Sequence, residues 1–543
     1  MSETPVKRPL LKMQRVEDGV EKENCKTKMD GGSSPSLYPP SPSLPVKRRL
    51  VLVENIGIVQ EENEQQICGG AENTPTGNGN PPTPLTPRAT DLTVCNMSAS
   101  PPPVSPKLDR WIRQKNRDLT LRKNDIQRSA KIVNHLRDKL LEFLKNNQER
   151  PYFRQATVLN SGSYFEMVKI NSPNEFDMMM ILPTPRLKWE DLDECPDIFY
   201  TLRLTRPTRT HEIRSYLLKD ERTISASRIR ADMRDLVCNF ISTYEDPPVA
   251  DSHWEVCEIK EDCPAVTLEL WKDDIKLEER QEEEAEMSVD IVPTLGVSQG
   301  WPDAARKGPN VGNWLGKNAL RKLVSQPFYF VPKTPKGDNL SETARESWRI
   351  SFSHIEKDII RNHGNRRTCC EGKSNRCCRK NCLRLLKQLI EGLKQRFPEV
   401  LEPLCSYHGK TAFFHALSRH GEDTYWAVGN LASCFMSLLY AFEGHAQSGL
   451  LPHFFVPSHN LFAPPAFPQS TLDFLVAALK EQRESNLPLL QIRAPAPPLR
   501  RSPSSALDLM PPVSATVTAS WLSHLKPAMM AMLMVVVLGL YLI

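Results

Sequence analysis

Two acidic side chains inside an apolar run constrain the fold of this chain more than any other feature. Glu175 and Asp177 are two residues apart in EFDMMMILP, a run typical of a buried strand. Alternate residues of a strand face the same way, so both carboxylates are expected on one face and Phe176 on the other. Carboxylates that close repel each other unless a cation lies between them. The pattern therefore predicts a β-sheet that presents oxygen ligands to a divalent cation such as Mg²⁺.

A third carboxylate and a Gly-Ser pair extend this pattern. Asp290 is flanked by β-branched residues in SVDIV, which predicts a neighbouring strand. Gly162 would allow close approach of the backbone, and Ser163 would contact phosphate oxygens. In a two-metal site, one ion helps to deprotonate the attacking hydroxyl and the other holds the triphosphate. The combination indicates nucleotidyl transfer; the alternative is a pair of solvated carboxylates on an edge strand.

A histidine and five cysteines form a compact cluster: His363, Cys369, Cys370, Cys377, Cys378 and Cys382. The first 30 residues contain no apolar segment typical of a secretory signal, so a reducing compartment is expected, where thiols bind metals rather than pair. Zinc takes four nitrogen or sulfur ligands in a tetrahedron. One choice uses His363 with the first three cysteines and leaves the last two as packing or free thiols. The choice among the last three cysteines stays open. Such a closed site predicts a structural role.

Positive charge is concentrated in two segments. The whole chain has 70 Lys and Arg against 65 Asp and Glu, so its net charge of +5 excludes a uniformly basic, histone-like binder. Residues 107–150, however, contain 13 basic against 6 acidic residues, and 361–396 contain 11 against 2. A rigid zinc loop with this charge is suited to the phosphates of duplex nucleic acid. The alternative is an ordinary solvated face.

Composition divides the chain into five parts. Of its 46 prolines, 16 fall in the first 106 residues, which predicts disorder there. The predicted parts are a disordered Pro/Ser-rich leader (1–106), a catalytic lobe that includes a basic N-terminal helix (107–340), a helical lobe with the zinc loop (341–487), a Pro/Ser-rich linker (488–526) and an apolar C-terminal segment (527–543). The last segment is 17 uncharged residues, about 25 Å as a helix. It could be a membrane tail anchor, a short interfacial segment or an aberrant terminal exon.

Hydrophobic periodicity predicts the main elements. Ile126, Val133, Leu136, Leu140 and Leu144 recur at helical spacing behind a candidate cap at Asn124-Asp125. Further helices are predicted over 227–243 and 383–397, and strands over 167–170, 176–183, 265–270 and 287–293. The acidic stretch 272–286 is predicted to be a solvated insert between two strands.

Several strings together resemble the vertebrate DNA-sensing cyclic GMP-AMP synthase family: GSYFEMVKINSPNEFD, SVDI, QPFYFVPK, WRISFSHIEKDI, NHGNRRTCC with CCRKNC, and SYHGKTAFFH. The resemblance covers about residues 107–487. It implies an α+β, bilobal nucleotidyltransferase fold, with a mixed β-sheet lobe and a helical lobe. It also implies an enzyme that makes 2′,3′-cyclic GMP-AMP from ATP and GTP when double-stranded DNA activates it, usually as a homodimer on DNA. The product would act on the stimulator of interferon genes in innate immunity and antiviral defence.

The resemblance also implies roles for individual residues. Glu175, Asp177 and Asp290 would hold two Mg²⁺ (or Mn²⁺) ions, and His363, Cys369, Cys370 and Cys377 would hold Zn²⁺. The nucleotide pocket would include Gly162, Ser163, Lys333, Arg349, Ser351, Ser353, Glu356, Lys387, Ser406 and Tyr407. DNA would be contacted by Lys123, Lys357, Arg367, Lys380 and Arg384. Cations neutralise phosphates, and Tyr407 could stack on a base.

Two positions depart from the family pattern, which often has hydroxyl residues there. They are Val292, two residues after Asp290, and Cys405, just before Ser406, so the choice of guanine is left open. Two rival functions follow: a related nucleotidyltransferase with another product or an RNA activator, and a catalytically idle, zinc-stabilised DNA-binding protein. The expected location is the cytoplasm, with the nucleus and a membrane tail anchor as further expectations.

Overall fold

The computed structural model describes residues 101–491, except 194, 245–248, 259–262, 276–284, 338, 365–368 and 371–375. The predicted leader up to residue 100, the linker from residue 492 and the apolar segment 527–543 lie outside the described residues. Within the part that is described, no helix is both long and apolar enough to cross a membrane.

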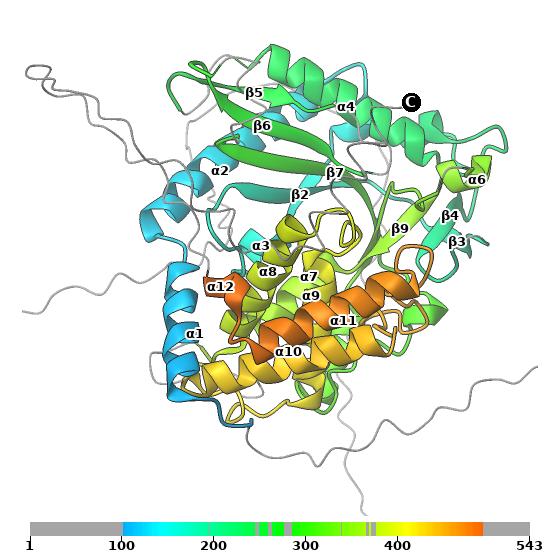
Figure 1. The fold of residues 1–543 in the computed structure, drawn as a ribbon. Coiled ribbons are helices and arrows are strands. Elements are labelled where there is room, and N and C mark those ends of the chain that lie inside the picture. The colour runs from blue at the N-terminus through cyan, green and yellow to red at the C-terminus, as the bar shows by residue number, and fades with distance from the viewer. Residues whose placement is uncertain are drawn as a thin grey trace, which may run out of the picture. The chain divides into compact units, whose positions relative to one another are not determined.

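One of the two parts of the fold is a mixed sheet (Figure 1). The strands of the described residues are β1 (Thr157–Ser161), β2 (Glu175–Leu182), β3 (Leu187–Asp191), β4 (Phe199–Leu204), β5 (Ser252–Val256), β6 (Val266–Lys272), β7 (Met287–Val297), β8 (Phe328–Val331) and β9 (Trp348–Ser351). Their order is β1-β2-β7-β8-β9-β4-β3, with β6 also paired to β7 and β5 to β6. Strands β2 and β7 are parallel, and the other pairs are antiparallel.

Strand β2 is buried on one face and partly buried on the other, which explains its nearly continuous apolar run. Phe176 and Met178 belong to the main core, whereas Met179 belongs to a smaller apolar cluster on the other face. The predicted strand at 176–183 is therefore confirmed, as is the opposite placement of Phe176 relative to the two carboxylates.

Helices make up the other part of the fold and flank the sheet. In the described residues they are α1 (Pro106–Asp118), α2 (Lys123–Asn146), α3 (Gly162–Phe165), α4 (Ala226–Ser242), α5 (Lys317–Val324), α6 (Glu342–Arg345), α7 (Ser353–Arg361), α8 (Arg379–Arg396), α9 (Ser406–Arg419), α10 (Leu431–Gln447), α11 (Gln469–Glu484) and α12 (Pro488–Gln491). Short 3₁₀ turns are η1 (Pro151–Phe153), η2 (Glu212–Tyr216), η4 (Asp303–Ala305) and η5 (Val428–Asn430).

The helices pack as their apolar stripes predict. Leu386, Leu389 and Leu393 of α8 recur at three- to four-residue spacing and are buried. Helix α8 contacts α9 and α10, α10 contacts α11, and α4 contacts β5, β6 and β7. The α+β fold with a sheet half and a helical half is thus confirmed. Strand β9 lies after the predicted lobe boundary at residue 340 and pairs with β8 and β4, so the sheet continues beyond that boundary.

Two local predictions are wrong. Residues 167–170 are not a strand: Met167 has a positive φ of 64°, which turns the chain directly after α3. Helix α2 is not capped by Asn124-Asp125, because it begins at Lys123 and its N-cap residue is Arg122, which makes no side-chain capping bond. The acidic stretch does connect two paired strands, β6 and β7, although residues 276–284 lie outside the described residues.

Candidate active site and zinc loop

The three predicted acidic residues converge on two adjacent strands. Asp177 of β2 lies directly opposite Asp290 of β7 in the parallel register, and Glu175 lies opposite Ser288. The hydroxyl of Thr267, on β6, donates a 2.6 Å hydrogen bond to Asp290 Oδ1. Lys169 forms a 2.5 Å ion pair with Glu175. The sheet therefore places all three carboxylates on one face, each in a defined position.

The electrostatics of this cluster favour a bound cation. Burial, together with the nearby Asp290 carboxylate, raises the pKa of Asp177 to about 6, while Lys410 acts in the opposite direction. A carboxylate with a raised pKa beside a second carboxylate is a site where a divalent cation replaces repulsion with attraction. Mg²⁺ binds through one or two carboxylates plus substrate phosphates. The donor set therefore fits Mg²⁺, which Glu175, Asp177 and Asp290 would hold.

Gly162 lies against Asp177 and has no room for a side chain. It follows Ser161, which pairs with Asp177 between β1 and β2. A Cβ atom on Gly162 would lie 1.6 Å from Asp177 Oδ2, and the residue has a φ of +79°. Both the space and the backbone conformation require glycine here. The predicted role of Gly162 in close backbone approach thus has a direct geometric cause.

We expect Gly162→Ala to lower nucleotidyl transfer by at least about a hundredfold, because the new methyl group would displace the Asp177 carboxylate. Steady-state kinetics would measure the loss. Gly444→Ala is the matched control, since a Cβ at Gly444 on α10 would meet nothing within 4 Å. Equal activities for the two variants would contradict the role assigned to Gly162.

Most of the predicted nucleotide pocket is carried by β9 and the helices that follow it. The Tyr407 hydroxyl donates a 3.0 Å hydrogen bond to Glu356 Oε1, which joins α9 to α7. The hydroxyls of Ser351 and Ser353 are 2.7 Å apart. Arg349 is on β9, and burial lowers its pKa, an effect that the negative groups around it oppose. These residues form a group of polar side chains between the sheet and the helices.

The other predicted pocket residues lie around this group. Ser163 is in α3, and Ser406 is the first residue of α9. Lys387 of α8 donates to the Val168 carbonyl at 3.4 Å, and burial with neighbouring lysines lowers its pKa to about 8. Lys333 follows β8, and its carbonyl accepts a hydrogen bond from Ser347.

The two departures from the family pattern also have definite positions. Val292 pairs with Met179 and packs against the apolar cluster that includes Tyr329 and Val331. Cys405 caps α9, and its Sγ lies 3.3 Å from His408 Nδ1. Val292 lies two residues along β7 from Asp290, hence on the same face as the triad.

His363, Cys369, Cys370 and Cys377 converge as zinc ligands should. Their four ligand atoms all lie within 4.8 Å of one another. Cys370 Sγ is 3.6 Å from Cys377 Sγ and 4.0 Å from Cys369 Sγ. A tetrahedron with Zn–S bonds of about 2.3 Å places its sulfurs about 3.8 Å apart. These donors therefore fit Zn²⁺, whereas Cys378 and Cys382 are buried in the hydrophobic core.

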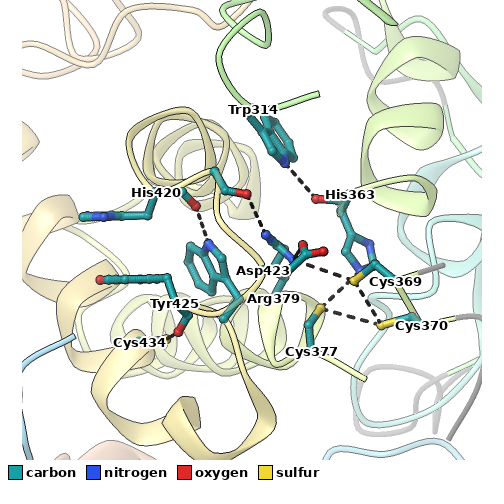
Figure 2. A network of polar contacts seen from close by, with 12 residues as sticks. Trp314, His363, Cys369, Cys370, Cys377, Arg379, His420, Asp423, Tyr425 and Cys434 are labelled. Atoms are coloured by element: carbon teal, nitrogen blue, oxygen red, sulfur yellow. Dashed lines mark hydrogen bonds and ion pairs between the residues drawn. The ribbon is translucent and has the colours of Figure 1, made fainter. Parts of the chain in front are cut away.

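Neighbouring groups orient these ligands (Figure 2). His363 Nδ1 lies 2.6 Å from the Ile360 carbonyl, so Nε2 faces Cys377 at 3.2 Å. Trp314 Nε1 donates to the His363 carbonyl at 2.8 Å. The fully buried Arg379 donates to Asp423 and approaches Cys369 Sγ at 3.8 Å. A hydrogen bond from the Cys369 thiol holds the pKa of Cys377 well below its usual range, which favours the thiolate that binds metal.

Positive side chains cluster beside the zinc loop. Burial lowers the pKa values of Lys357 in α7 and Lys380 in α8. The positive charge of Arg361 lowers the pKa of Lys357 further, and that of Arg384 lowers the pKa of Lys380. Phosphate oxygens would relieve this like-charge crowding. Lys123 is the first residue of α2, away from the zinc ligands in sequence, and Arg367 lies outside the described residues.

Sequence reasoning missed several residues that position the site. Thr267 holds Asp290, Lys169 pairs with Glu175, and Lys410 lies 2.7 Å from Glu166 and 3.0 Å from Glu356. Thr267 carried a partial signal, because it is a polar residue inside the predicted strand 265–270, although the sequence did not identify Asp290 as its partner. Lys410 carried none, because its partners are distant in sequence.

Known proteins resemble this chain over about two thirds of its length. Residues 164–362 match the Mab-21 protein nucleotidyltransferase domain, and residues 378–481 match the Mab-21 protein HhH/H2TH-like domain. The chain is 36% identical over 371 residues to cyclic GMP-AMP synthase of Mus musculus, which covers 68% of each chain. It is 34% identical over 372 residues to cyclic GMP-AMP synthase of Sus scrofa, covering 68% of this chain and 70% of that one. It is also 24% identical over 372 residues to the cyclic GMP-AMP synthase-like receptor of Magallana gigas, covering 66% and 56%.

Proposed function

The chain belongs to the cyclic GMP-AMP synthase family of Mab-21 nucleotidyltransferases, and from this membership we propose that it makes 2′,3′-cyclic GMP-AMP from ATP and GTP when double-stranded DNA activates it. The observation that carries the proposal is the parallel register of Asp177 and Asp290, with Gly162 pressed against Asp177. Two Mg²⁺ ions bound here would activate the attacking hydroxyl and stabilise charge on the leaving pyrophosphate.

The chain's own residues can bind and orient two nucleotides beside these carboxylates. Arg349 and Lys387 provide positive charge for phosphates. Tyr407 presents an aromatic ring held by Glu356, suited to stacking on a base. The hydroxyls of Ser351 and Ser353 supply hydrogen-bonding groups for the sugar or base.

Contacts between the basic surface and the catalytic turn support activation by DNA. Arg384 of α8 donates a 2.8 Å hydrogen bond to the carbonyl of Met167, which directly follows the α3 turn that carries Gly162 and Ser163. Lys380 lies 4.0 Å from the Met167 sulfur. Phosphates that bind Arg384 and Lys380 would therefore alter the turn beside the triad. The zinc loop would hold the start of α8 in place for this contact.

The biological setting follows from the same proposal. The product would act on the stimulator of interferon genes as a second messenger of antiviral defence. The enzyme would bind DNA as a homodimer in the cytoplasm or nucleus. Segment 527–543 would be a membrane tail anchor, a short interfacial segment or an aberrant terminal exon.

Product analysis tests the proposal directly. With Mg²⁺, ATP and GTP, double-stranded DNA is expected to raise product formation at least about tenfold, and mass spectrometry should identify the mixed cyclic dinucleotide. RNA of equal length is the control activator. DNA binding with no turnover would instead support the catalytically idle protein, and stimulation by RNA alone would support an RNA sensor.

A second product is favoured by Val292 and Cys405. The isopropyl group of Val292 cannot donate or accept a hydrogen bond, and it packs in an apolar cluster on the triad face. A base edge above it would lose a polar partner that a hydroxyl residue could supply. A cyclic dinucleotide of different base composition is therefore the alternative, and the product's mass separates the two.

A further inference from the structure

Lys410 connects the turn beside the triad to the nucleotide pocket. Its Nζ lies 2.7 Å from Glu166 Oε1 and 3.0 Å from Glu356 Oε2. The three side chains have exposures of 15%, 0% and 8% for Lys410, Glu166 and Glu356. Glu166 ends α3, Glu356 is in α7, and Lys410 is in α9. One buried ammonium group therefore holds three elements together.

The Glu166 contact secures the α3 turn. This helix is four residues long, and its first residue, Gly162, is placed against Asp177. Its C-cap residue is Glu166, after which Met167 turns away with a φ of +64°. Glu166 Oε2 has no hydrogen-bond partner among the described residues. The position of the turn, and of Ser163 within it, therefore depends on the ion pair of Oε1 with Lys410.

The Glu356 contact orients Tyr407. Glu356 Oε1 accepts a 3.0 Å hydrogen bond from the Tyr407 hydroxyl, which also lies 2.8 Å from His453 Nε2. Lys410 is three residues after Tyr407 in α9, on the same side of the helix. Lys410 thus holds one oxygen of Glu356 while the other holds the tyrosine ring.

The charge balance keeps Lys410 protonated. Burial opposes the charged ammonium, but Glu166 and Glu356 together raise the pKa of Lys410 above its ordinary value. Removal of this cation would leave two buried carboxylates without their shared counter-charge. The arrangement is therefore a three-residue ion cluster with the lysine at its centre.

We propose that Lys410 is a positioning residue of the nucleotidyl-transfer reaction, which holds the Gly162–Ser163 turn and the Tyr407 ring in a fixed relation to each other. The proposal rests on the proposed function for the identity of the nucleotides. Lys410 acts through Glu166 and Glu356. Variants of Lys410 and Glu166 separate its effect on catalysis from its effect on folding.

Four variants test the proposal: Lys410→Met, Lys410→Arg, the double variant Lys410→Met/Glu166→Gln, and the control Lys480→Met at an exposed position of α11. Lys410→Met is expected to lower the melting temperature and to reduce kcat by at least about a hundredfold. Lys410→Arg keeps the cation and should retain at least a tenth of wild-type kcat. The double variant removes the uncompensated Glu166 charge, so it should regain at least half of the lost melting temperature while its kcat stays low.

Recovery of kcat together with melting temperature in the double variant would overturn the proposal, because Lys410 would then act on folding alone. If the wild type forms no dinucleotide, the proposed function fails, and the increase in melting temperature caused by ATP with Mg²⁺ becomes the readout. If ATP with Mg²⁺ no longer raises the melting temperature of the double variant but still raises that of Lys480→Met, positioning by Lys410 is supported. If ATP with Mg²⁺ still raises the melting temperature of the double variant, positioning by Lys410 is contradicted.

Discussion

Asp177→Asn is expected to reduce nucleotidyl transfer by at least about a thousandfold, equivalent to about 4 kcal/mol of transition-state stabilisation. The change keeps the size of the side chain but removes one negative charge from the pair that Asp177 forms with Asp290 across β2 and β7. A neutral amide is a poor ligand for Mg²⁺, which prefers carboxylates and phosphates. Initial rates of dinucleotide formation with saturating DNA would measure the loss.

The same substitution should stabilise the protein once Mg²⁺ is removed. Burial and Asp290 raise the pKa of Asp177 to about 6, above its ordinary value of 3.8. The folded state therefore binds this proton more tightly than the unfolded state, and its stability falls as the pH rises from about 4 to about 6. At pH 7 the charged group destabilises the fold by at most about 3 kcal/mol. Asp177→Asn lacks this penalty, so in EDTA it should melt above the wild type at pH 7, with the difference shrinking below pH 4.

These two measurements together exclude unfolding as the cause of inactivity. Asp473→Asn, at an exposed position of α11, serves as the control and should change neither quantity. An active Asp177→Asn enzyme would refute the triad. An inactive variant that is also less stable than the wild type at pH 7 in EDTA would contradict the electrostatic account of the site.

The sequence could predict those parts of the site that depend on local periodicity. Glu175 and Asp177 share a face because strands alternate, and the apolar residues around them indicated a central strand. The candidate zinc cluster was predictable because its members are close in sequence and few residue types bind zinc, although spacing alone left the choice among Cys377, Cys378 and Cys382 open. The failed strand at 167–170 shows the limit of this reasoning. Val168 and Ile170 are apolar at alternate positions, as in a strand, but Lys169 between them is buried too, the backbone turns at Met167 and this segment pairs with no strand.

The partners of the residues that hold the catalytic groups in place were not predictable, because these contacts arise from tertiary structure. Thr267 contacts Asp290 across 23 residues of sequence, and Lys410 contacts Glu166 across 244. A lysine on a helix is usually solvated, and nothing in SYHGKTAFFH distinguishes Lys410 from such a residue. Its importance appears only once α3, α7 and α9 meet around it. Val292 and Cys405 are the opposite case. Their departure from the family pattern is visible in the sequence, and analysis of the product measures its effect on the choice of base.

Cys370→Ala is expected to lower DNA-stimulated turnover by at least about a hundredfold and to release zinc, while the carboxylate triad keeps its geometry. Cys370 Sγ is one of four ligand atoms within 4.8 Å of one another. Its backbone has a positive φ of 64°, an uncommon conformation for a residue other than glycine, and a metal–sulfur bond would hold it there. Zinc analysis of the purified protein and turnover with and without DNA would measure both effects.

Turnover with DNA and turnover without DNA distinguish the role of the zinc loop from the role of the triad. The loop leads directly into α8, which carries Lys380 and Arg384 towards Met167, so its loss should disrupt DNA stimulation before it disrupts the strands β2 and β7. Turnover without DNA should therefore fall less than stimulated turnover. Cys238→Ala in α4 is the matched control, because that cysteine belongs to no ligand cluster in the described residues. Full zinc content and full DNA stimulation in Cys370→Ala would show that Cys370 is not a ligand of a zinc site on which DNA stimulation depends.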